Sequence, residues 1–120
     1  MSLRAIRGAI QVPGNTAADI AAGVQELISA ILEANRLVPS DVISVFFTST
    51  VDLNAAFPAA ACREMGFANV PLIGSVEVDV PGALDRTIRA MLHVETTKSP
   101  DQISHIYLHG AAALRRDIAQ

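Results

Sequence analysis

Four side chains in this sequence, two guanidiniums, a carboxylate and a phenol, carry charges or hydrogen-bonding groups that could form a polar site. They are Arg7, Glu77, Arg89 and Tyr107. A guanidinium keeps its charge at physiological pH and grips a carboxylate through two parallel hydrogen bonds, and a phenol adds one further donor. Residues so far apart in sequence can act together only if the fold brings them to one surface. The elements that carry them therefore have to be identified first.

Hydrophobic periodicity predicts the elements in the first part of the chain. Residues Leu3–Val12 alternate as a strand, and a turn at Pro13–Asn15 leads into a helix over Ala17–Asn35. Either Asn15 or Thr16 can cap this helix. Its apolar residues recur at helical spacing and form one stripe: Ile20, Val24, Leu27, Ile28, Ile31 and Leu32.

The middle of the chain predicts a strand, a short helix and a second strand. β-Branched and aromatic residues favour a strand over Ile43–Thr50. A short helix over Phe57–Met65 ends at Gly66, a residue typical of the position that follows a helix. A strand is then expected over Val70–Val80, where Pro81 terminates it.

Two segments complete the sequence pattern. Residues Ala83–Thr96 fit either a helix, through Leu84 and Ile88, or a strand by alternation, and we favour the strand. A turn at Ser99–Asp101 precedes a last strand over Ile103–Leu114. The sum is a single domain over residues 1–120 of the α/β (α+β) class, a mixed five-stranded sheet with one long helix on one face.

Alternation along these strands places the four side chains on the sheet face that the helix does not need. One face of each strand is aliphatic and suits packing under the helix, whereas the other carries Arg7, Ser75, Glu77, Arg89 and Tyr107. The same face carries residues too apolar for a freely wetted surface: Ala5, Ala9, Met91 and Ala111. A second subunit is the natural cover. Periodicity alone nevertheless favours an ordinary exposed face with salt bridges.

Composition narrows the class of protein. The apolar content is 51%, and the net charge of −3 counts against a nucleic-acid partner. The chain has no apolar run of about 20 residues and no signal-peptide pattern, so we expect a soluble cytoplasmic protein without a membrane segment. Cys62 is the only cysteine. His105 and His109 on one strand would lie roughly 13 Å apart, too far for a shared ion, so no metal site is expected.

The chain also resembles the AroH-type chorismate mutases along nearly its whole length. The matching segments are, in order, Arg4–Val12, Asp52-Leu53, Ala56–Ala59, Arg63-Glu64, Val70–Leu72, Glu77-Val78, Pro81-Gly82, Ile88-Arg89, His105–Leu108 and Ala112–Arg115. The resemblance implies an isomerase without cofactor that rearranges chorismate to prephenate in phenylalanine and tyrosine biosynthesis. It also implies a pseudo-barrel homotrimer whose active sites lie between subunits.

The same resemblance implies roles for individual residues. Arg89 would donate to the ether oxygen and to a carboxylate of chorismate, while Arg7 and Tyr107 would bind the side-chain carboxylate. Glu77 would accept the ring hydroxyl and orient Arg89, without acting as a base. The further substrate contacts that it implies are Phe57, Ala59, Arg63, Leu72, Ile73, Gly74, Ser75, Leu114 and Arg115. Among these, Phe57 and Leu114 are expected as apolar walls, and Arg63 and Arg115 fit equally well as solvated charges.

Departures from the family pattern leave some details open. Some relatives carry lysine where this chain has Ala60, which favours weaker substrate binding here. The ring hydroxyl contact would come from the backbone or Ser75, and the tail beyond Arg115 is expected to be mobile. One alternative is a non-catalytic trimeric ligand-binding protein on the same fold. Another is an enzyme that uses Glu77 as a base, whose rate would depend on a carboxylate titration.

Overall fold

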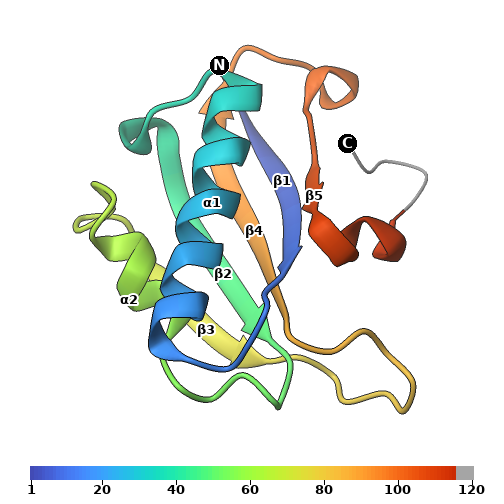
Figure 1. Ribbon diagram of the computed structural model, residues 1–120. Helices are drawn as coiled ribbons and strands as arrows, with labels where there is room; N and C mark the ends of the chain where they lie inside the picture. The colour runs from blue at the N-terminus through green and yellow to red at the C-terminus, as the bar shows by residue number, and fades with distance from the viewer. Residues whose placement is uncertain (116–120) are drawn as a thin grey trace.

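A mixed five-stranded sheet lies at the centre of the fold in the computed structural model, which describes residues 1–115 of the chain (Figure 1). Its strands are β1 (Ser2–Gln11), β2 (Val42–Ser49), β3 (Leu72–Val76), β4 (Thr87–Thr96) and β5 (Ile106–Leu108). They are arranged in the order β3-β2-β4-β1-β5. β4 runs antiparallel to both of its neighbours, whereas the outer pairs β1–β5 and β2–β3 are parallel. The predicted fold class is confirmed.

Helix α1 (Ala17–Asn35) lies across one face of the sheet, as Figure 1 shows. Thr16 is its N-cap, because the Thr16 hydroxyl accepts a hydrogen bond from the Asp19 backbone N–H at 3.0 Å. The predicted stripe faces the sheet, and all of its members except the half-buried Leu32 are buried: Ile20, Val24, Leu27, Ile28 and Ile31. Burial of this stripe against the aliphatic face of β1, β4 and β2 forms the main core.

The short helix α2 (Pro58–Arg63) packs beside α1 near the β3 end of the sheet (Figure 1). Pro58 occupies the first turn, where its missing N–H costs nothing. Three 3-10 helices complete the described residues: η1 (Pro39–Asp41), η2 (Pro100–Gln102) and η3 (His109–Leu114). Among the helices of residues 1–115, none is long and apolar enough to cross a bilayer.

The ambiguous segment is a strand, β4, and it occupies the centre of the sheet. Its register pairs it with β1 on one side and β2 on the other. The residues that turn toward α1 are buried: Ile88, Ala90, Leu92 and Val94. Tertiary pairing on both sides decides the outcome, since a helix here would leave the facing backbone groups of β1 and β2 without partners. Residues 83–86, which we included in the segment, belong to the preceding turn.

Two predicted strands are too long, and their pairing explains why. The strand predicted over Val70–Val80 is limited to Leu72–Val76, because its partner β2 ends at Ser49. The last strand, predicted over Ile103–Leu114, is limited to Ile106–Leu108, and η3 follows it. β5 pairs only with Gly8–Ile10 of β1, and the positive φ of 54° at His109 ends the extended course. The alanine-rich run after His109 then favours helical turns.

The face opposite α1 is left uncovered within one chain. Phe46 of β2 is 50% exposed there, and Ile73 of β3 is 58% exposed. Met91 of β4 and Leu3 of β1 are also exposed on this side. We call this side of the sheet, opposite α1, the open face. An apolar surface of this kind on an otherwise well-packed domain is typical of an interface.

Candidate active site

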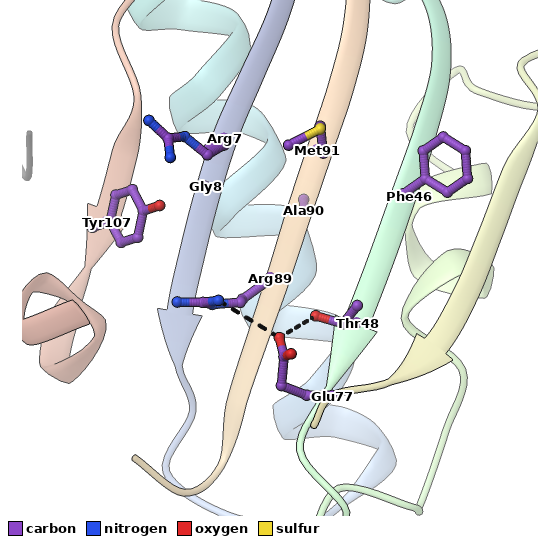
Figure 2. A pocket seen from close by; sticks show the side chains of 9 residues that line it. All are labelled: Arg7, Gly8, Phe46, Thr48, Glu77, Arg89, Ala90, Met91 and Tyr107. Carbon is purple, nitrogen blue, oxygen red and sulfur yellow. Dashed lines mark hydrogen bonds and ion pairs between the residues drawn. The ribbon is translucent and has the colours of Figure 1, made fainter. Parts of the chain in front are cut away.

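The open face contains a pocket of about 210 Å³. Its lining comes from the strands β1, β2, β4 and β5 and from Glu77, the residue that follows β3. The pocket is lined by Arg7, Gly8, Phe46, Thr48, Glu77, Arg89, Ala90, Met91 and Tyr107 (Figure 2). The structure therefore brings together all four side chains that strand alternation had assigned to this face. We call this hollow the arginine pocket.

Strand register explains why these residues meet. Ala9 of β1 lies opposite Arg89 of β4 on one side and opposite Tyr107 of β5 on the other. Arg89 in turn lies opposite Thr48 of β2. One row of the sheet thus runs from Tyr107 through Arg89 to Thr48 on the open face. Ala9, the residue between them on β1, is fully buried and packs against Tyr107 and Ala111.

The neighbouring row supplies the second guanidinium and the apolar wall. Arg7 lies opposite Met91, and Met91 lies opposite Phe46. Rows on one face of a sheet are about 7 Å apart, a spacing that small organic anions with two carboxylates can span. The guanidiniums of Arg7 and Arg89 therefore lie on the same face, one row apart.

Glu77 enters the pocket from beyond the end of β3. Its backbone N–H donates to the carbonyl of Ser49 at 2.9 Å, which continues the β2–β3 pairing by one residue. Its carboxylate accepts a hydrogen bond from the Thr48 hydroxyl at 2.9 Å through Oε2 and another from the Val78 N–H at 3.1 Å through Oε1. Arg89 Nη1 lies 3.8 Å from the same Oε2. The pair is a loose ion pair rather than a hydrogen bond.

His105 contacts the backbone of Arg7, and its surroundings disfavour the protonated ring. Its Nδ1 accepts a hydrogen bond from the Arg7 backbone N–H at 3.0 Å. Burial lowers the pKa of His105, and the positive charges of Arg7 and Arg115 lower it further. The Arg115 guanidinium therefore lies close enough to His105 to disfavour protonation of its ring. The neutral ring keeps the β1 backbone at Arg7 joined to the segment that leads into β5.

Tyr107 is almost fully buried, although it lies on the open face. It packs in a small second cluster with Ala9 and Ala111, against which the half-buried Leu84 and Leu114 rest. Figure 2 shows its hydroxyl directed toward the pocket. Leu114 therefore packs against the cluster that contains Tyr107, from the 3-10 helix η3 and not from the predicted strand, and it does not line the arginine pocket.

The remaining predicted contacts lie at a different place in the same chain. Most of them line a groove of about 660 Å³ at the β3 edge: Phe57, Ala59, Leu72, Ile73, Gly74 and Ser75. Phe57 is 82% exposed at this groove, which we call the edge groove. Arg63 is exposed on α2 and lines neither hollow. A single chain therefore does not bring these residues to Arg7 and Arg89. The tail beyond Arg115 lies outside the described residues.

Two lining residues of β2, Phe46 and Thr48, were missed by the sequence interpretation. We had sorted faces for the other four strands only. A signal was available, because Phe46 and Thr48 are two residues apart and so share one face of the strand, opposite the apolar Val45 and Phe47. What the sequence could not supply is the register that sets Thr48 opposite Arg89.

The histidines and the cysteine have separate surroundings. His105 precedes β5 and His109 opens η3, so the two are not on one strand as we had expected. His109 Nε2 pairs with Glu26 at 2.9 Å, and burial raises the pKa of the Cys62 thiol to about 12. Within residues 1–115, no three His, Cys, Asp or Glu side chains are grouped so that they could hold a metal ion.

The charges of the arginine pocket suit a small dianion. Two guanidiniums outweigh the single carboxylate, and the Tyr107 hydroxyl supplies a neutral donor. Phe46, Ala90 and Met91 form the apolar part of the lining, which would exclude water from a bound ring. Charge–charge attraction is stronger in such a partly desolvated site than in bulk water.

Comparison with known proteins agrees with this chemistry. Residues 3–118 match the family described as chorismate mutase type I. The chorismate mutase AroH of Bacillus subtilis (strain 168) is 40% identical over 120 residues, covering 99% of this chain and 94% of that protein. The Thermus thermophilus protein of the same name is 42% identical over 117 residues, covering 97% and 96%. A solved chorismate mutase from Clostridium thermocellum superimposes with a TM-score of 0.90 at 48% identity, covering 92% of this chain and 98% of that one.

Proposed function

Because the chain belongs to the chorismate mutase type I family, we propose that its arginine pocket is where it rearranges chorismate to prephenate. The chain is a chorismate mutase, an isomerase of aromatic amino acid biosynthesis. The observation that carries the assignment of the site is the convergence of Arg7, Glu77, Arg89 and Tyr107 on one pocket of the open face.

The reaction is an intramolecular pericyclic rearrangement, and it sets the demands on the site. One C–O bond breaks while one C–C bond forms, and no proton enters or leaves. The enolpyruvyl side chain must first fold over the ring, and negative charge then grows on the ether oxygen. A protein can accelerate this step by holding the compact conformer and by placing a donor at that oxygen.

The residues divide these tasks between them. Arg89 lies at the centre of the pocket, between β1 and β2, and donates to the ether oxygen as its charge grows. Arg7 and Tyr107 bind the side-chain carboxylate from the β1–β5 side, which favours the folded conformer. Glu77 accepts a hydrogen bond from the ring hydroxyl of chorismate. The 3.8 Å separation from Glu77 leaves the N–H groups of Arg89 available to the substrate.

A homotrimer with sites between subunits accounts for the two separate hollows. The edge groove with Phe57 at its rim is exposed in one chain, and the arginine pocket opens on an uncovered apolar face. If the β3 edge of one subunit covers the open face of the next, Phe57 and the Ile73–Ser75 segment close over the neighbour's arginine pocket. Cyclic closure of three copies then makes three equivalent sites.

Loss of chorismate absorbance, followed with purified wild type and Arg89→Ala, tests the function and the role of Arg89 together. We expect wild-type turnover and a fall in kcat of about 10²–10³-fold in the variant, the range seen when a donor to a developing oxyanion is removed. Arg89→Lys should recover only part of the loss, since a point charge does not replace the planar fork.

Arg4→Ala is the matched control, because Arg4 lies on the same strand as Arg7 but donates to the Lys98 carbonyl at the far end. Its activity should equal that of the wild type. No turnover by the wild type would refute the function, and equal turnover by Arg89→Ala would refute the role of Arg89.

A further inference from the structure

One carboxylate oxygen in the arginine pocket has two competing partners. Oε2 of Glu77 accepts the Thr48 hydroxyl at 2.9 Å and faces Arg89 Nη1 at 3.8 Å. Figure 2 shows both interactions meeting at this oxygen. A distance of 2.9 Å is a normal hydrogen bond, whereas 3.8 Å is beyond the hydrogen-bond range. The hydroxyl holds the carboxylate and the guanidinium does not.

Thr48 is the rigid member of this trio. It lies inside β2, where its backbone is paired with Arg89 of β4 on one side and with Ser75 of β3 on the other. Its branched side chain also has few rotamers. By contrast, Glu77 and Arg89 have long side chains that are 27% and 41% exposed. The Thr48 hydroxyl therefore fixes Oε2, the oxygen that faces Arg89, while the Val78 N–H binds the other oxygen, Oε1.

We propose that Thr48 is a positioning residue for the rearrangement: its hydroxyl holds the Glu77 carboxylate away from Arg89, so that the N–H groups of Arg89 remain available to the substrate. The proposal rests on the function proposed above. A direct Arg89–Glu77 hydrogen bond would be charge-assisted and would have to be broken by each substrate molecule. Thr48 prevents that bond by position: its hydroxyl holds Oε2 of Glu77 against β2, where Arg89 Nη1 stays 3.8 Å away.

Thr48→Val tests the proposal, because valine keeps the shape and the strand preference while it removes the hydroxyl. We expect the Glu77 Oε2 to Arg89 Nη1 separation to shorten to hydrogen-bond distance in a crystal structure of the variant. In solution we expect kcat/KM to fall about tenfold, with most of the loss in kcat, since Arg89 acts mainly in the transition state. Thr48→Ser keeps the hydroxyl and should retain activity within about twofold.

A second pair of variants separates positioning from simple stabilisation of the fold. In a Glu77→Ala background, Thr48→Val should have no further effect on kcat, because the carboxylate through which Thr48 acts is gone. A structural role would give the same loss in both backgrounds. An equal loss in Thr48→Val and Thr48→Ser, or an unchanged Glu77–Arg89 distance in Thr48→Val, would overturn the proposal.

The wild-type assay separates this proposal from the proposed function. Wild type without chorismate turnover would refute the function, while the distance in the Thr48→Val crystal structure still decides whether Thr48 holds Glu77 off Arg89. An active wild type with equally active Thr48→Val would refute the role of Thr48 alone.

Discussion

His105 connects the strand that carries Arg7 to the segment that leads into β5 and Tyr107. Its Nδ1 must carry no proton to accept the Arg7 N–H, so protonation of the ring breaks this link. The added charge would also lie beside the guanidiniums of Arg7 and Arg115. A single titration thus affects both the backbone and the field of the arginine pocket.

Stability should consequently fall in mild acid. The pKa of His105 is lowered from 6.5 in the folded protein, so below that value the unfolded chain binds a proton more readily than the folded chain does. The contribution of the neutral His105 ring to the free energy of unfolding is fully present above pH 6.5. It is lost as the pH falls through the lowered pKa that His105 has in the folded protein. Urea unfolding of the wild type at pH values from about 8 to about 5, which span the titration of histidine, measures this loss of stability.

His105→Asn is the informative variant, since the asparagine Oδ1 can accept from the Arg7 N–H as Nδ1 does. Its free energy of unfolding should depend less on pH over this range. His109→Asn serves as the control, because His109 pairs with Glu26 at the exposed start of η3. A pH dependence that His105→Asn leaves unaltered would contradict this account.

Among the elements, α1 packs closely against Val12, the residue that follows β1. Gly23 of α1 lies against Val12, and a Cβ added at Gly23 would overlap Val12 Cγ1. Val12 is buried and β-branched, so it has little room to rotate. The absence of a side chain at Gly23 lets the helix lie close to the sheet and bury its stripe.

Gly23→Ala should destabilise the protein despite the better helix propensity of alanine. Overpacking costs about 1–3 kcal/mol and the helix gains about 1 kcal/mol, so we expect a net loss of about 1 kcal/mol by thermal or urea unfolding. In a Val12→Ala background the overlap is gone, and the same change should then be neutral or stabilising. The same destabilisation in both backgrounds would show that Val12 is not the cause.

At the scale of the whole molecule, the uncovered open face and the exposed edge groove predict association. If three chains associate, sedimentation equilibrium should give a mass three times that of the 12.6 kDa chain. The side chains of Phe46 and Ile73, which are exposed on the open face of one chain, should become protected from hydroxyl-radical labelling as the trimer forms. A monomer at assay concentration that retains full activity would refute intersubunit sites.

Subunit mixing tests which residues are shared across the interface. Arg89→Ala removes the central donor, and Phe57→Asp puts a negative charge where the neighbour's dianion would bind, so each variant alone should be nearly inactive. Coexpressed in equal amounts, they should form trimers in which about a quarter of the sites carry both native residues. Activity that does not rise above that of the separate variants would place Phe57 outside the neighbour's site.

Much of the fold could be predicted because it depends on local periodicity. The bounds of α1 are those predicted, and β1 and β2 differ by one residue at each end. The lengths of β3 and β5 could not be predicted, since the sequence of Val78–Val80 and of Ala111–Ala113 permits either state. Their ends depend on where the partner strands β2 and β1 stop offering backbone groups.

The sequence by itself determined the composition of the site: alternation put Arg7, Glu77, Arg89 and Tyr107 on one face, and the ordered family resemblance attached a reaction to them. Tertiary structure alone decided which residues meet. Strand register set Thr48 opposite Arg89 and brought the Thr48 hydroxyl to the Glu77 carboxylate. Alternation is a property of each strand, whereas register and strand ends result from pairing between segments far apart in the chain, and that is why only the fold reveals the oxygen that Thr48 and Arg89 share.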